Sequence, residues 1–233
     1  MSRLEKVRSF HSIGHKTEAA QDAVFKWLKQ HIVMLPRGNG VFLTESEVSR
    51  ATGTSRTPVR EALLRLEADG FLQIVPKKGA YVPPVTDADI EAVMQARGLV
   101  EDWCIRRAVR HGETLAAELD RLIEQQAEHQ HDPIAFIESD RQFHRTIVSA
   151  AGNPVLSGFY ESLRDRQLRM GVHAIATSDR RTGEVLAEHA AIAAGLRSGD
   201  TERATAAVAQ HLSTTLAALQ LPIMTSWGRS PSS

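Results

Sequence analysis

Apolar residues recur every three or four positions along most of the chain, and this period predicts a mainly helical protein. The first such stretch, residues 17–31, places Ala20, Val24, Trp27 and Leu28 on one helix face. Beyond residue 84 the pattern stays helical almost to the end. The helices predicted there lie near residues 87–110, 113–130, 133–151, 154–175, 181–197 and 200–220.

Helix-start and helix-stop residues predict two short helices before residue 71. Thr44 and Glu47 have the spacing of a capping box, so a short helix is expected directly after Thr44 and before Gly53. Ser55 is expected to cap a second helix that ends at Gly70. With the helix at 17–31, this makes three helices in the first part of the chain.

Two short strands follow these helices. Residues 71–75 and 80–82 are apolar or β-branched and flank the basic turn Pro76-Lys77-Lys78-Gly79. Three helices and a hairpin in this order predict a winged helix-turn-helix.

A proline pair, Pro83 and Pro84, continues neither the strand pattern nor the helix pattern and marks the domain boundary. The predicted fold class is mainly α, with an N-terminal winged helix-turn-helix and a C-terminal all-α bundle of six helices. The predicted domains are residues 15–84 and 85–222, followed by a flexible tail at 223–233 that is rich in Ser, Gly and Pro.

Composition limits the class of protein. The 233 residues are 42% hydrophobic and 24% charged, with 28 basic and 28 acidic side chains and the single cysteine Cys104. Such a chain is a soluble globular protein, and the absence of a long apolar run and of paired cysteines predicts a cytoplasmic protein outside the membrane. Residues 1–84 hold 13 Lys and Arg against 8 Asp and Glu, and the remainder is correspondingly acidic, so a polyanion is expected to meet the first part only.

The segment 55–60 gathers donors at a predicted helix start, where free backbone amides and the helix dipole favour phosphate. Arg56 and Arg60 present forks that match the O6 and N7 of guanine, so they are predicted to read bases in the major groove. Ser55 and Thr57 are predicted to bond phosphates.

The basic turn is predicted to form the wing of the DNA-binding domain. Lys77 and Lys78 would contact phosphates, and Gly79 would allow a close approach to the duplex. The alternative for the arginines at the helix start is pairing with carboxylates such as Glu61 or Glu67 on a solvated helix.

The run from Thr52 to Val82, TGTSRTPVREALLRLEADGFLQIVPKKGAYV, closely resembles the DNA-binding domain of the GntR family of bacterial transcription regulators. The resemblance implies a homodimer on a roughly palindromic operator in double-stranded DNA. It also implies DNA contacts from Arg56, Arg60, a hydroxyl at the helix start and the wing glycine. Ser46 departs from the pattern, because some members of the family have an arginine at this position.

Three predicted bundle helices place ionisable groups on their apolar faces. Asp140 and His144 share one face, and His189 and His211 lie on the faces of the last two helices. An unpaired buried polar group costs about 1–3 kcal/mol, so a shared divalent cation explains all four together. Zn, Ni or Mn suits one carboxylate and three imidazoles. The alternative for each histidine is a core imidazole bonded to a neighbour.

Arg97 lies on the apolar stripe of its own predicted helix, so its guanidinium is predicted to face the interior around the predicted metal ion. There it would bind the carboxylate of an effector. The alternative is a pair with Glu101 within the helix.

Residues 87–220 are similar to the FCD effector-binding domain of the FadR subfamily, and the six-helix count is similar to its VanR-like branch. The resemblance is carried by DRQFH, AGNP, EH and HL, at residues 140–144, 151–154, 188–189 and 211–212. In metal-containing members of that domain the matching aspartate and three histidines bind the ion.

The sequence therefore predicts a transcriptional repressor with no catalytic residues, controlled by a small organic acid at a metal-centred pocket. One alternative is a metalloenzyme domain fused to a DNA-binding module, with Glu188 available as a base. Another is a sensor of the metal ion itself.

Overall fold

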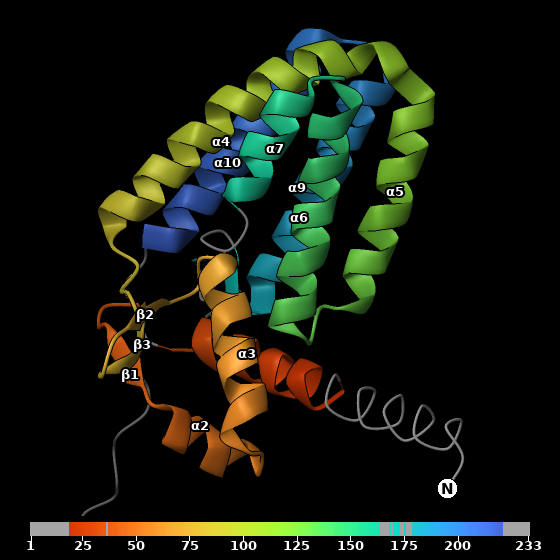
Figure 1. The fold of residues 1–233 in the computed structure, drawn as a ribbon. Helices are drawn as coiled ribbons and strands as arrows, with labels where there is room; N and C mark the ends of the chain where they lie inside the picture. Colours follow the sequence, from red (N-terminus) through yellow and green to blue (C-terminus); the bar gives the residue numbers. More distant parts are fainter. Residues whose placement is uncertain are drawn as a thin grey trace, which may run out of the picture. The chain divides into compact units, whose positions relative to one another are not determined.

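The computed structural model describes residues 19–35, 37–163, 168, 170–172, 175 and 179–220 (Figure 1). The chain divides into two compact units, Met1–Thr86 and Asp87–Ser233, just after the predicted boundary. Residues 15–18 of the predicted winged domain and the predicted tail at 223–233 lie outside the described residues. None of the described helices has the length and apolar character that a membrane span requires.

Three helices form most of the first unit: residues 19–33, α2 (Glu45–Thr52) and α3 (Arg56–Ala68). The predicted capping box is confirmed, because Thr44 accepts a hydrogen bond from the Glu47 amide while the Glu47 carboxylate accepts one from the Thr44 amide at 2.8 Å. Gly53 ends α2 with a φ of 64°, a left-handed conformation that favours glycine. Ser55 occupies the N-cap position of α3, but the expected cap is wrong, since its side chain makes no cap hydrogen bond.

The sheet of the first unit has one strand more than the sequence predicts. β2 (Gln73–Val75) and β3 (Gly79–Val82) form the expected antiparallel hairpin, and β1 (Val41–Leu43) pairs with the other edge of β3. β1 is too short to show an alternating pattern in the sequence. The predicted first strand loses its first two residues, because Phe71 and Leu72 precede β2 and are buried in the core.

Gly79 is required by the packing of the sheet. Its φ is 109°, and a Cβ atom at this position would lie 2.6 Å from the carbonyl oxygen of Leu43 in β1. The glycine at the end of the basic turn therefore allows a close approach between two strands of the protein itself.

The second unit is helical. The elements that the structure describes here are α4 (Asp87–Ala108), the 3-10 turn η1 (Val109–His111), α5 (Gly112–Glu128), α6 (Pro133–Ala150), α7 (Pro154–Ser162), α9 (Asp179–Arg197) and α10 (Thr201–Gln220). Packed neighbours follow the order α4, α10, α9, α5, α6 and back to α4 (Figure 1). Five of the described helices thus surround a common interior, and α7 packs against α6 and α4.

The predicted helix starts of this unit are confirmed. Asp132 and Asn153 each accept hydrogen bonds from two backbone amides of the following turn, and a proline occupies the first turn of both helices. Asp200 caps α10 by accepting from the Arg203 amide at 3.0 Å. Asp132 and Asp200 thus cap two of the helices that carry candidate ligands, α6 and α10.

The single helix predicted over residues 154–175 is wrong at its C-terminal side. α7 stops at Ser162, and Leu163 is its C-cap residue. No glycine or proline marks this stop. Apolar residues continue across it at the helical period, and the following are buried: Leu163, Leu168, Val172 and Ile175.

Candidate functional site

The start of α3 exposes the side chains predicted to contact DNA. Ser55, Arg56, Thr57 and Arg60 are exposed, whereas the two residues between Thr57 and Arg60 are buried. Two guanidiniums and two hydroxyls therefore stand beside the backbone amides that have no partner within the helix.

Both arginines contact the first turn of α2. Arg60 Nε donates to Glu45 Oε1 at 2.7 Å, and Arg56 Nη2 donates to the Ser46 hydroxyl oxygen at 3.3 Å. The hydrogen bond to Glu45 raises the pKa of Arg60 above its ordinary value. The carboxylate that pairs with Arg60 thus comes from the neighbouring helix, and not from α3 itself.

The basic turn forms the tip of the β2–β3 hairpin. Lys77 and Lys78 are exposed there, and the Lys78 amide closes the turn by donating to the Val75 carbonyl at 3.0 Å. Lys77 has a φ of 65°, the only positive value among non-glycine residues in the described part of the chain. Two ammonium groups are therefore presented on a tightly folded loop.

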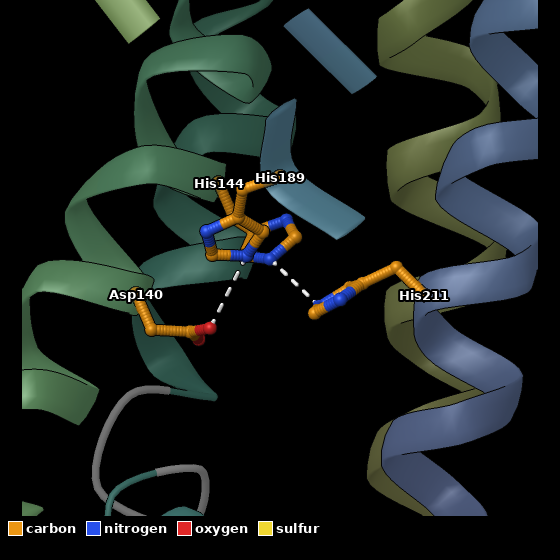
Figure 2. Close-up of side chains that lie close together, drawn as sticks. All are labelled: Asp140, His144, His189 and His211. Carbon is orange, nitrogen blue, oxygen red and sulfur yellow. Dashed lines mark hydrogen bonds and ion pairs between the residues drawn. The ribbon is translucent and has the colours of Figure 1, made fainter. Parts of the chain in front are cut away.

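In the interior of the second unit, Asp140, His144, His189 and His211 come together (Figure 2). They extend from α6, α9 and α10, and one ligand atom from each lies within 4.8 Å of the others. The three imidazoles are buried, and the carboxylate is partly buried. The fold therefore gathers all four side chains that the sequence placed on apolar helix faces.

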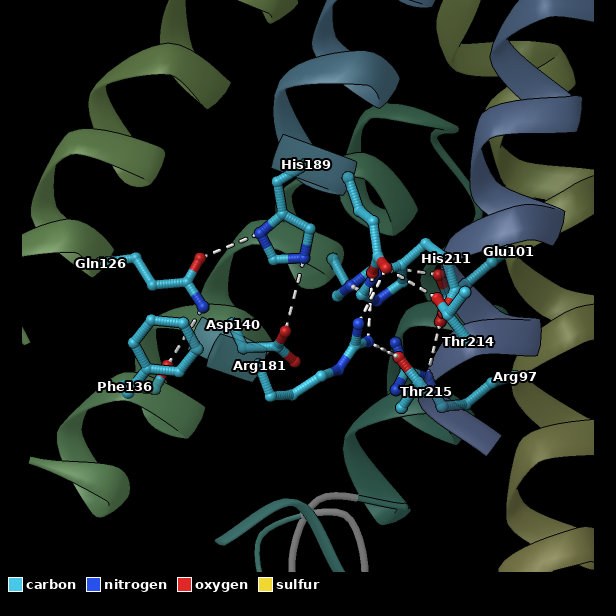
Figure 3. Close-up of polar contacts among 12 residues, drawn as sticks. Arg97, Glu101, Gln126, Phe136, Asp140, Arg181, His189, His211, Thr214 and Thr215 are labelled. Atoms are coloured by element: carbon cyan, nitrogen blue, oxygen red, sulfur yellow. Dashed lines mark hydrogen bonds and ion pairs between the residues drawn. The ribbon is translucent and has the colours of Figure 1, made fainter. Parts of the chain in front are cut away.

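Each imidazole has its own acceptor beside Nδ1. The acceptors are Gln126 for His189 at 2.9 Å, Glu188 for His211 at 2.7 Å and Glu101 for His144 at 2.8 Å. The acceptors of His189 and His211 assign the proton of these two rings to Nδ1, so each neutral ring presents the lone pair of Nε2. His144 Nδ1 lies close to Glu101 but makes no hydrogen bond. Gln126 is itself fixed, because its amide nitrogen donates to the Phe136 carbonyl at 3.3 Å (Figure 3).

The Nε2 atoms face each other and Asp140. His144 Nε2 and His211 Nε2 are 3.1 Å apart, and His189 Nε2 lies 3.3 Å from Asp140 Oδ1. With the His189 proton on Nδ1, the lone pair of its Nε2 meets a carboxylate oxygen, and this contact is favourable only with a proton or cation between the two atoms. His189 Nε2 is also buried without a hydrogen bond. The donor set therefore fits a divalent cation.

The protonation states suit metal ligands. Burial lowers the pKa of His189 to about 3, and burial also lowers the pKa of His211, although Glu188 opposes that shift. Burial would raise the pKa of Asp140, but the contact with His189 and the other imidazoles hold it well below its ordinary value. Neutral imidazoles and an ionised carboxylate are the forms that bind metal ions.

Arg97 and Glu101 form a buried ion pair on α4, with 2.8 Å between Nε and Oε1. Tyr160 donates its hydroxyl proton to the same Oε1 at 2.8 Å. Burial would raise the pKa of Glu101, but the Arg97 charge and His144 hold it below its ordinary range. The pairing alternative for Arg97 is therefore present, and the same carboxylate lies beside His144 Nδ1.

Glu188 on α9 forms a hydrogen bond with His211 and is itself held by several donors. Arg181 donates to both of its carboxylate oxygens, at 2.8 and 3.1 Å, and the Thr214 hydroxyl donates at 2.7 Å. Burial would raise the pKa of Glu188, but the hydrogen bonds from His211, Arg181 and Thr214 lower it to about 2. Arg181 also donates to Thr215 on α10 at 3.0 Å.

A cavity of about 40 Å³ adjoins the cluster. By this measure it has room for about three water molecules. Asp140 and three arginines, Arg97, Arg141 and Arg181, provide charged groups in a lining that is otherwise mostly aliphatic. Arg97 Nη2 and Arg141 Nε are buried and make no hydrogen bond. Two of the arginines that line the cavity thus have a donor without a partner.

Sequence spacing does not show that Gln126, Glu188 and Glu101 lie beside the imidazoles. Gln126 continues the apolar face of Leu115 and Leu119 on α5, so the reasoning applied to the histidines could have found it. Arg181 shares a face of α9 with Glu188 by spacing. The contacts themselves join different helices and have no sequence signal.

Comparison with known proteins gives two family matches. The model for "Bacterial regulatory proteins, gntR family" matches residues 20–82, and the model for the "FCD domain" matches residues 92–214. These segments lie within the two structural units.

Similar proteins are described as regulators. RspR, an HTH-type transcriptional repressor of Escherichia coli, is 28% identical over 202 residues, covering 84% of this chain and 87% of RspR. The probable D-xylose utilization operon transcriptional repressor of Paenarthrobacter nicotinovorans is 30% identical over 181 residues, covering 77% of this chain and 79% of that protein. The solved structure of E. coli McbR/YncC has a TM-score of 0.63 and 26% identity, covering 87% of this chain and 96% of the other.

These relatives are regulators rather than enzymes, and Glu188 is engaged by four donors instead of being free as a general base. The metalloenzyme alternative is therefore wrong. The chain belongs to the GntR family of bacterial transcription regulators, with a helix-turn-helix DNA-binding domain followed by an FCD domain.

Proposed function

We propose that this DNA-binding regulator is a repressor whose affinity for its operator is controlled by a small organic acid bound beside a divalent metal ion. The observation that carries the proposal is the convergence of three imidazoles and one carboxylate next to a cavity lined by arginines that have unsatisfied nitrogens. The two similar proteins described as repressors support the direction of control.

The proposed ligands of the ion are Asp140, His144, His189 and His211. Zn, Ni or Mn fits one carboxylate and three imidazoles. A bound ion of this kind would supply positive charge and open coordination positions to an anion. The acceptors at Nδ1 of His189 and His211 fix the orientation of these rings, as is expected for groups that support metal ligands.

The proposed effector is a small carboxylate held by Arg97. The Arg97 Nη2 nitrogen lacks a hydrogen bond, and a carboxylate in the cavity would accept one from it. Because Glu101 already holds Nε, the guanidinium is fixed in orientation before the effector arrives. The small cavity favours an acid of a few carbon atoms.

On the DNA side, Arg56 and Arg60 are proposed to read bases, because their guanidiniums lie on the exposed first turn of α3. Phosphate contacts are proposed for the remaining exposed groups and for the wing. These residues are Ser55, Thr57, Lys77 and Lys78, and Gly79 is proposed to allow a close approach of the wing to the duplex.

The active species is proposed to be a homodimer on a roughly palindromic operator. An effector can shift DNA affinity only if it binds the DNA-compatible and DNA-incompatible dimer arrangements with different affinities. The acid is therefore expected to bind the arrangement with low DNA affinity more tightly.

A pair of variants separates the two sites. Arg60→Ala is expected to weaken binding to an operator selected from random DNA by about 10- to 100-fold, because a bidentate base contact contributes about 1–3 kcal/mol, while metal content stays at that of the wild type. His189→Ala is expected to lose the metal and to keep operator binding. Loss of both properties in either variant would contradict the assignment.

A screen identifies the effector class. Thermal unfolding of metal-loaded protein with sugar acids, hydroxy acids and aromatic acids is expected to show stabilisation by at least one small acid, and that acid should lower operator affinity. Arg97→Lys should reduce both effects, since lysine lacks the planar fork. Operator binding that follows the metal alone, with no acid effective, would instead identify a metal sensor.

A further inference from the structure

The two proposed base-reading arginines are both held by the first turn of α2. Arg60 reaches Glu45 at 2.7 Å, and Arg56 reaches Ser46 at 3.3 Å. The Arg60 side chain is 64% exposed and that of Glu45 is 30% exposed, so the pair lies on the surface but is partly shielded. A carboxylate therefore stands at the face that is expected to meet a polyanion.

The contact uses one particular edge of the guanidinium. Glu45 takes Nε, which leaves the Nη1 and Nη2 donors free. Two parallel N–H groups are what guanine O6 and N7 accept. The hydrogen bond also limits the rotamers of a long side chain, so less freedom is lost when Arg60 engages a base.

The charge of Glu45 acts differently on phosphates and on bases. Binding to DNA of any sequence depends on how many phosphates the protein neutralises, and a carboxylate beside Arg60 cancels part of that attraction. A base edge carries no net charge, so the same carboxylate opposes a base contact much less. Glu45 is thus expected to weaken non-specific binding more than operator binding.

We propose that Glu45 is a positioning residue that sets DNA specificity, by orienting Arg60 toward a base and by opposing its contact with phosphates. This rests on the proposed base-reading role of Arg60. The juxtaposition of Glu45 and Arg60 in the fold carries the inference.

Asp22 provides a matched control. It pairs with Arg65 of the same helix α3 at 2.6 Å, and both side chains are about half exposed. Asp22→Asn removes one negative charge from the same unit, but the pair is not at the start of α3. Glu45→Gln and Asp22→Asn therefore differ mainly in which arginine they release.

The test measures affinities for a selected operator and for scrambled DNA over a range of salt concentrations. Glu45→Gln is expected to lower the ratio of operator affinity to scrambled-DNA affinity by at least about fivefold. For scrambled DNA, the slope of log K against log salt concentration should become more negative by up to about one, since about one more phosphate can be neutralised. Asp22→Asn is expected to leave the ratio unchanged. Because the ratio compares two DNAs on one protein sample, it does not depend on the folded fraction.

The same measurements in an Arg60→Ala background complete the cycle. Glu45→Gln should then have no further effect on the ratio, because Glu45 acts through Arg60. An equal effect with and without Arg60, or no larger effect than that of Asp22→Asn, would overturn the proposal for Glu45. If Arg60→Ala alone leaves the ratio unchanged, the proposed role of Arg60 fails as well.

Discussion

Two adjacent acidic residues on α4 form ion pairs that are expected to differ in their effect on stability, because one pair is buried and the other is exposed. Glu101 pairs with Arg97 and Asp102 pairs with Arg106, each four residues away on the same helix. The Glu101 side chain is 2% exposed, whereas that of Asp102 is 53% exposed. Water screens the Asp102–Arg106 pair, so either charge can lose its partner at little cost in stability. In the buried Glu101–Arg97 pair, each charge needs the other to compensate its loss of hydration.

Glu101→Gln is expected to destabilise the second unit by about 3–5 kcal/mol, because it leaves the Arg97 charge buried without its counter-charge. Denaturant unfolding of the whole chain measures this change. Asp102→Asn, the neighbouring control, should leave the unfolding midpoint nearly unchanged. Similar shifts for the two variants would mean that the Arg97 pair contributes no more than a surface contact.

At the scale of elements, α9 and α10 approach each other closely at Gly195. A Cβ atom at Gly195 would lie 2.7 Å from the Cα of Ala204, so the two helices meet backbone to backbone. α9 carries His189 and α10 carries His211. The distance between His189 and His211 therefore depends in part on the absence of a Cβ atom at Gly195.

Gly195→Ala is expected to destabilise the protein by about 1–3 kcal/mol, because the added methyl group forces the helices apart. Metal affinity should fall as well, since His189 and His211 would separate. Thermal unfolding and a competition titration with a metal indicator measure the two effects.

Gly183 on the same helix is the control, because a Cβ atom there would have no neighbour within 4 Å. Gly183→Ala should stabilise the chain by about 1 kcal/mol through helix propensity and leave metal affinity unchanged. Unchanged metal binding in Gly195→Ala would show that the close approach does not set the ligand spacing.

At the scale of the whole molecule, the two units have separate cores, and the candidate metal cluster belongs to the second alone. Each of the five surrounding helices contributes a group to the cluster or to its supporting contacts: Arg97 and Glu101 from α4, Gln126 from α5, Asp140 and His144 from α6, Glu188 and His189 from α9, and His211 from α10. A ligand that binds only this folded arrangement stabilises it through mass action.

Chelation is therefore expected to lower the unfolding midpoint of the second unit and to leave the first unit unchanged. If the free metal concentration before chelation is 100 times the dissociation constant, chelation should lower the free energy of unfolding by about 2.7 kcal/mol. Differential scanning calorimetry with and without a chelator measures it, and His189→Ala serves as the control that should not respond. An equal response in that variant would place the metal elsewhere.

Much of the fold could be predicted because its signals are local. The capping box at Thr44, the proline-started helices after Asp132 and Asn153, and the wing turn depend on residues within about one turn of one another. The four candidate ligands could be found for the same reason, since a helical period alone places an ionisable group on an apolar face.

Only the tertiary structure decided which groups meet. β1 forms because it pairs with the free edge of β3. The end of α7 at Ser162 is not marked by a glycine or proline. The pairing of Gln126 with His189 and of Glu45 with Arg60 joins helices whose separation in sequence carries no periodic signal. Spacing along the chain fixes the face on which a side chain lies, but the packing of whole helices decides what that face touches.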